Sequence, residues 1–95
     1  MSEDPGADAR QPKAREDVVF RALADEWVLY DPRTQDLHVL NATAAAVWAC
    51  CDGTLDAGGI AREVAAHMEG APPLEAVLED VTRVLERFRS DGLLE

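Results

Sequence analysis

Three short, mainly apolar runs stand out in the first half of the chain, and they predict a small β-sheet. The runs are VVFRAL at 18–23, EWVLYD at 26–31 and LHVL at 37–40, all rich in β-branched and aromatic residues. Turn-forming sequences separate them, with AD at 24–25 after the first run and DPRTQD at 31–36 after the second. Because connections this short join neighbouring antiparallel strands, we expect a three-stranded antiparallel meander.

The spacing of apolar residues changes from two to three or four after Asn41, which predicts a first helix, ATAAAVWACC at 42–51. Asn41 or Thr43 is placed to cap this helix, because a short polar side chain accepts a hydrogen bond from the free amides of a first turn. Gly53 can take the left-handed conformation that ends it. A second helix is predicted from Thr54 or Asp56 to about 67, before the break GAPP at 70–73.

The third predicted helix carries the strongest periodic signal in the chain. Its apolar residues recur at spacings of three and four: Leu74, Val77, Leu78, Val81, Val84, Leu85 and Phe88. Because successive residues lie about 100° apart on a helix, this spacing predicts a stripe centred on Leu74, Leu78, Val81 and Leu85, with Val77 and Val84 at one margin. The sequence DG at 91–92 ends the helix, and we expect the two leucines that follow to fold back on the domain.

This order of elements predicts an α+β domain of winged-helix-like architecture, a three-stranded antiparallel β-meander followed by three α-helices. Residues 1–17 are rich in Asp, Glu, Pro, Ala and Gly and have no apolar periodicity. Such a segment cannot bury enough surface to offset the entropy lost on ordering, so we expect a disordered acidic N-terminal tail. The folded domain is then expected to span 18–95.

Nineteen acidic and nine basic residues give the chain a net charge of −10. A field of this sign repels phosphate backbones and anionic lipid surfaces, so we expect no nucleic-acid partner and no membrane partner. The first residues lack the layout of a signal peptide, and no apolar run reaches the roughly 18 residues that cross a bilayer. We therefore expect a cytoplasmic protein.

Cys50 and Cys51 are the most conspicuous candidates for chemistry, as a redox pair or as thiolate ligands. A redox pair normally has two intervening residues, and a zinc site needs four ligands. The remaining candidates, His38 and His67, lie on different predicted elements without metal-ligand spacing. We expect the cysteines to act as small apolar residues, one facing the core and one its rim.

Sequence motifs for catalysis are absent: the chain has no glycine-rich phosphate loop, no nucleophile elbow and no histidine-acid metal motif. The sequence therefore predicts no enzyme, no metal and no cofactor. A binding surface is the simpler expectation. If the third strand lies at a sheet edge, its free backbone can accept an extended peptide, while the margin of the third helix receives the side chains of that peptide.

Several short motifs occur in a characteristic order: Tyr30-Asp31, VLN at 39–41, Thr43-Ala44, Val47-Trp48, Asp52-Gly53, Asp80-Val81 and DGLL at 91–94. In this order and spacing, the chain from Val18 to Leu94 resembles the PqqD family. The resemblance implies the domain called the RiPP recognition element, which serves ribosomally made, post-translationally modified peptides. Members of that family are not themselves catalysts. They bind the leader segment of a precursor peptide as an added strand.

The resemblance also implies which residues touch the leader and which partners take part. The peptide-binding residues are expected to be Asp36, Leu37, His38, Val39 and Leu40 on the third strand, and Val77, Asp80, Val81, Val84 and Arg87 on the third helix. The partners are a precursor leader peptide and a maturation enzyme, either a radical SAM enzyme or a leader peptidase. We expect the domain itself to be a monomer.

Three alternatives stay open from the sequence. The chain could be a structural subunit whose apolar helix docks permanently on a partner enzyme. The order of elements also permits a winged-helix nucleic-acid binder, although no basic cluster supports it. The third alternative is a redox or metal role for the two cysteines.

Overall fold

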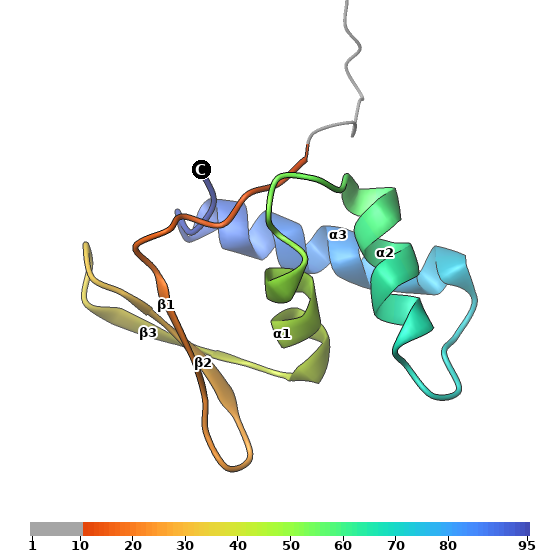
Figure 1. The fold of residues 1–95 in the computed structure, drawn as a ribbon, viewed down its shortest axis with the longest axis horizontal. Helices are drawn as coiled ribbons and strands as arrows, with labels where there is room; N and C mark the ends of the chain where they lie inside the picture. The colour runs from red at the N-terminus through yellow and green to blue at the C-terminus, as the bar shows by residue number, and fades with distance from the viewer. Residues whose placement is uncertain (1–10) are drawn as a thin grey trace, which may run out of the picture.

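The structure is a computed structural model, and it describes residues 11–95. Six elements follow one another in the order predicted from the sequence (Figure 1): β1 (Val19–Ala22), β2 (Trp27–Asp31), β3 (Asp36–Leu40), α1 (Ala42–Ala49), α2 (Ala57–Ala66) and α3 (Leu74–Ser90). The predicted α+β class, a three-stranded antiparallel meander followed by three helices, is confirmed. The disorder expected for residues 1–10 lies outside the described residues.

The sheet has the strand order β1-β2-β3, so β2 is central and both β1 and β3 are edge strands. Both pairings are antiparallel, and Leu29 of β2 lies opposite Phe20 on one side and His38 on the other. Leu29 is fully buried. Because side chains alternate across a strand, the face of the sheet that carries Leu29 is the one packed on the helices.

Side-chain caps begin the first two helices. Asn41 Oδ1 accepts a hydrogen bond from the Ala44 amide at 2.8 Å, and Asp56 Oδ1 accepts one from the Gly59 amide at 2.8 Å. Each bond satisfies an amide that has no partner within its helix. Of the two predicted caps for α1, the structure therefore selects Asn41, and Gly53 takes the predicted left-handed conformation with a φ of 85°.

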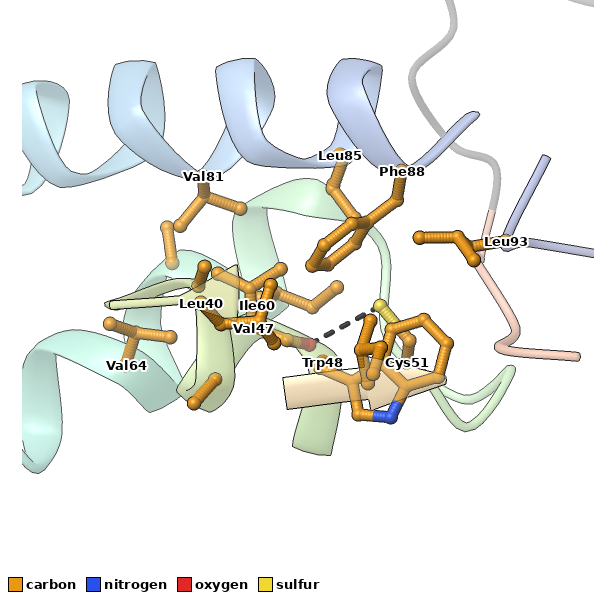
Figure 2. Packing of buried hydrophobic residues seen from close by; sticks show 14 of the residues in the cluster. Leu40, Val47, Trp48, Cys51, Ile60, Val64, Val81, Leu85, Phe88 and Leu93 are labelled. Carbon is orange, nitrogen blue, oxygen red and sulfur yellow. Dashed lines mark hydrogen bonds between the residues drawn. The ribbon is translucent and has the colours of Figure 1, made fainter. Parts of the chain in front are cut away.

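The core lies between the three helices and the inner face of the sheet (Figure 2). Within it, the rings of Trp48 and Phe88 meet edge to face, with centroids 5.3 Å apart and planes at 85°. This is a favoured geometry for two aromatic quadrupoles. The residues around them are almost all aliphatic, among them Leu29, Leu40, Val47, Ile60, Val81, Leu85 and Leu93.

The buried face of α3 differs from the predicted stripe by part of a turn. Val77, Val81, Leu85 and Phe88 are buried, whereas Leu74 and Leu78 remain 47% and 38% exposed. The prediction that Leu74 and Leu78 lie at the centre of the stripe is therefore wrong. Two rows of apolar residues compete for the centre of this helix, and packing against α1 and α2 decides between them. Periodicity within one helix carries no information about its neighbours.

The disorder predicted for residues 1–17 is wrong for residues 12–15, which are hydrogen-bonded to the folded domain. From Pro12 to Arg15 the chain lies between the α1–α2 loop and the C-terminus (Figure 1), where the Ala14 amide donates to the Cys51 carbonyl and the Arg15 amide donates to the Leu93 carbonyl. These bonds join residues far apart in sequence, so the local composition of the segment does not reveal them. Leu93 is buried, as expected for leucines that fold back on the domain.

Within residues 11–95, no helix is long and apolar enough to cross a membrane.

Candidate functional site

β3 presents two different faces and one open edge. Leu37 and Val39 are 66% and 54% exposed on the outer face of the sheet, whereas Leu40 is buried and the His38 side chain is only 15% exposed on the inner face. The strand therefore contributes alternate side chains to the core and to the surface.

The backbone groups at the open edge follow from one hydrogen bond in the first hairpin. The Leu23 amide donates to the Glu26 carbonyl at 2.7 Å, which makes Leu23 and Glu26 a hydrogen-bonded pair of the β1–β2 ladder. Such pairs alternate with non-bonded pairs along antiparallel strands, so the backbone of Leu29 turns away from β1 and toward β3.

The same alternation carries into β3. Leu29 lies opposite His38, so the His38 backbone pairs with β2, and the N–H and C=O groups of its neighbours Leu37 and Val39 point to the open edge. An extended peptide that pairs with those groups would add a fourth strand beside β3.

A surface pocket of about 340 Å³ lies where β3 ends and α1 begins, against the exposed margin of α3. Its lining comes from two parts of the chain: Asn41 and Thr43 on one side, and Asp80, Arg83, Val84 and Arg87 on the other. Because Asn41 directly follows Leu40, the pocket adjoins the C-terminal end of β3.

Polar and charged side chains contact one another within α3 and between α3 and β3. Arg83 Nη1 donates to Asp80 Oδ1 at 2.9 Å within the helix. At the end of α3, Asp91 Oδ2 lies 3.6 Å from His38 Nδ1 and 3.8 Å from Arg87 Nε. Asp91 therefore connects the inner face of β3 to the same helix margin that lines the pocket.

The structure brings some of the predicted site residues together and separates others. Asp80, Val84 and Arg87 lie on the exposed margin of α3 and line the pocket. Val77 and Val81 are 2% and 0% exposed and belong to the core. Val77 and Val81 were expected on the wall of the peptide groove. That expectation is corrected here, because neither side chain is open to a ligand.

Three lining residues were not predicted from the sequence: Asn41, Thr43 and Arg83. Arg83 precedes Arg87 by four positions, so the i, i+4 spacing of two arginines is a signal that places both on one helix face. Asn41 and Thr43 carried a signal only for helix capping. Their place in the pocket depends on how α1 packs against α3.

A family model for coenzyme PQQ synthesis protein D (PqqD) matches residues 26–94. The chain belongs to the PqqD family. The match begins next to β2 and includes both sides of the pocket, whereas residues 11–25 lie outside it.

This PqqD-family chain also resembles a solved structure described as TbiB1 in complex with the TbiA(beta) leader peptide. The TM-score is 0.73 at 23% sequence identity, and the match covers 87% of this chain and 94% of that one. This likeness shows a shared fold. No curated protein matches the chain.

The two cysteines of this PqqD-family domain divide as predicted, since Cys51 is buried and Cys50 is half-buried. The Cys51 thiol donates to the Val47 carbonyl at 3.2 Å (Figure 2), and burial raises the pKa of this thiol to about 12. A thiol held in its neutral form is a poor nucleophile and a poor metal ligand. Among residues 11–95, no group of three or more His, Cys, Asp or Glu residues is placed to hold a metal ion.

Proposed function

We propose that this domain is a non-catalytic peptide chaperone that binds the leader segment of a ribosomally synthesised precursor peptide and delivers it to a modifying enzyme. The observation that carries the proposal is the open edge of β3, where the backbone of Leu37 and Val39 is unpaired beside a pocket on α3. Membership of the PqqD family supports it. The structure of TbiB1, which is described as a complex with a leader peptide, supports it further.

In this proposal the leader binds as a fourth strand. Its backbone pairs with the N–H and C=O groups of Leu37 and Val39. Leader side chains then alternate between two environments. Those opposite His38 and Leu40 face α3 and its pocket, and those opposite Leu37 and Val39 lie beside these exposed side chains on the outer face of the sheet.

Backbone pairing gives affinity with little dependence on sequence, so the pocket on α3 is the proposed source of selectivity. A leader strand of about five residues must offset its own ordering entropy, which favours an affinity on the order of micromolar to sub-micromolar. Affinity of this size allows capture followed by release, as delivery requires.

The proposed recipient is a maturation enzyme, either a radical SAM enzyme or a leader peptidase. A leader held on β3 leaves the rest of the precursor extending from the domain, so the modified segment stays accessible to that enzyme. We place this exchange in the cytoplasm, where a precursor is made and where unpaired thiols such as Cys50 and Cys51 persist.

Titration calorimetry with the leader of a precursor encoded beside this gene tests the proposal. We expect saturable heat at micromolar concentration with one leader per domain. No heat at high micromolar concentration of leader would overturn the proposal. The same leader with its residues in scrambled order is the matched control, because it keeps composition and charge and loses the order of side chains along the strand.

A further inference from the structure

We infer that the pocket between the start of α1 and the margin of α3 accepts a carboxylate side chain, so that the preferred leader carries an aspartate or glutamate at one position that faces α3. This inference rests on the proposed function and specifies the peptide for the same site. Arg83 and Arg87, which line the pocket, are the residues that would bind this carboxylate.

The charged residues among those lining the pocket are two arginines and one aspartate, so the lining is net positive in a chain of net charge −10. The aspartate, Asp80, already accepts a hydrogen bond from Arg83. A basic peptide side chain would have to compete with Arg83 for it.

Hydrogen-bond donors predominate among the groups that remain. The arginine side chains are 70% exposed at Arg83 and 50% exposed at Arg87. The 3.8 Å between Arg87 Nε and Asp91 is longer than a hydrogen bond, so the guanidinium keeps its donors for another acceptor. A guanidinium binds a carboxylate through two parallel N–H bonds, which is a geometry that a neutral side chain does not match.

The opposite wall adds donors of its own. The side-chain oxygen of Asn41 is committed to the Ala44 amide, which leaves the NH₂ group of Asn41 as a donor. Thr43 contributes a hydroxyl, which can donate to a carboxylate or accept from an arginine. The donors of this wall therefore add to those of the two arginines, and a carboxylate can accept from both.

Three basic residues elsewhere in the described chain are already paired with acids. Lys13, Arg15 and Arg33 are paired with Glu16, Glu95, Asp17 and Asp31 around the N-terminal segment. The overall field of the chain repels acidic peptides, so a single acid placed in the pocket is favoured and a run of acids is not.

The position of this acid follows from the strand geometry. Asn41 and Thr43 come directly after Leu40, so the pocket lies at the Leu40 end of β3. The leader residue opposite Leu40 points its side chain to the α3 side, two positions from the residue opposite His38. The acid is therefore expected opposite Leu40, flanked by residues whose side chains lie on the outer face.

Selection from a phage-displayed library of roughly twelve-residue random peptides tests the inference whichever leader is the natural one. The targets are the unmodified protein, the double variant Arg83→Gln with Arg87→Gln, and the control Arg21→Gln with Arg62→Gln. The control removes the same charge from β1 and α2, away from the pocket. We expect an Asp or Glu at one aligned position in peptides selected by the protein and by the control, and its loss with the pocket variant.

A selected peptide and its Asp→Asn or Glu→Gln partner then complete a double-mutant cycle. The acidic peptide is expected to bind the pocket variant about fivefold more weakly, whereas the amide peptide binds both proteins equally. Peptides that need the β3 edge, shown by loss of binding to Val39→Pro, but lack any acidic preference would overturn this inference and leave the proposed function intact. If no selected peptide depends on Val39, both are overturned.

Discussion

Arg15 and Asp31 form a two-point ion pair: Arg15 Nη1 donates to Asp31 Oδ2 and Nη2 donates to Oδ1, each at 3.0 Å. Arg15 Nη1 also donates to the Gly92 carbonyl at 2.8 Å. One guanidinium therefore holds the N-terminal segment, the end of β2 and the C-terminal turn together. Both side chains are buried, and Arg15 also donates to the Asp17 carboxylate, so it is the Asp31 charge that depends on Arg15 for its charged partner.

The ion pair predicts how acid affects stability. The hydrogen bonds from Arg15 hold the pKa of Asp31 at about 2, below the ordinary value of 3.8. A depressed carboxyl pKa contributes stability that is fully present above the unfolded value and is lost as the pH falls through the folded value. The stability contributed by Asp31 should therefore be constant above about pH 5 and decline between about pH 4 and 2.

Urea unfolding of the unmodified protein and of Asp31→Asn at a series of pH values measures this contribution. The unmodified protein should be the more stable at neutral pH, and the difference should narrow as the pH falls from about 4 to 2. Asp25→Asn, in the exposed β1–β2 turn, is the matched control. A difference between Asp31→Asn and the unmodified protein that stays constant down to pH 2 would contradict the assignment.

The core assignment predicts unequal costs for two apolar residues of α3. Phe88 is fully buried against Trp48, so Phe88→Ala should lower the free energy of unfolding by about 3–5 kcal/mol. Leu78 is 38% exposed, so Leu78→Ala should cost less than about 1 kcal/mol. If urea unfolding shows that both variants lose the same free energy of unfolding, Leu78 must lie at the centre of the buried stripe after all.

The buried thiol predicts slow chemistry at Cys51. With a pKa of about 12, the thiol is almost entirely protonated at about pH 8. In the Cys50→Ser variant, a thiol reagent should modify Cys51 at least about 100-fold more slowly in the native protein than in urea. The Cys51→Ser variant reports Cys50 as the comparison. Modification of native Cys51 at the rate of the unfolded chain would show that the side chain is accessible.

The elements and their order follow from the sequence because each rests on a local signal. Runs of β-branched and aromatic residues between turn sequences define the strands, Asn41 caps α1, and apolar spacing defines α3. The ordered segment before β1 could not be predicted in this way. Its backbone is hydrogen-bonded to residues 51 and 93, and Arg15 contacts Asp31 through the tertiary fold.

The candidate site also contains residues that a local sequence pattern predicts and residues that depend on packing between elements. The strand Asp36–Leu40 could be placed from its pattern, and its position at an edge follows once the meander is assumed. The α3 wall was predicted in part, because a helical pattern identifies which residues share a face and not which edge of that face stays exposed. For this reason Val77 and Val81 were predicted to line the groove although they are buried, and Arg83 was not predicted although it lines the pocket.

The direction of the backbone groups on the two edge strands predicts that a proline on β3 weakens leader binding and a proline on β1 does not. The Val39 amide points to the open edge of β3, and the Phe20 amide points to the open edge of β1. Proline at either position removes a donor that no strand of the domain uses. We expect Val39→Pro to weaken leader binding at least about tenfold and Phe20→Pro to leave it unchanged, with similar small losses of stability. Equal binding by the two variants in calorimetry would place the peptide elsewhere.

Amide hydrogen exchange with and without saturating leader tests strand addition most directly, because it reports each backbone N–H separately. In the free domain, the amides of Leu37 and Val39 on one edge, and of Phe20 and Ala22 on the other, should exchange rapidly. If the leader adds to β3, its binding should protect the Leu37 and Val39 amides and leave the Phe20 and Ala22 amides unchanged. Unprotected Leu37 and Val39 amides in a leader-saturated sample, or protection confined to Phe20 and Ala22, would contradict strand addition to β3.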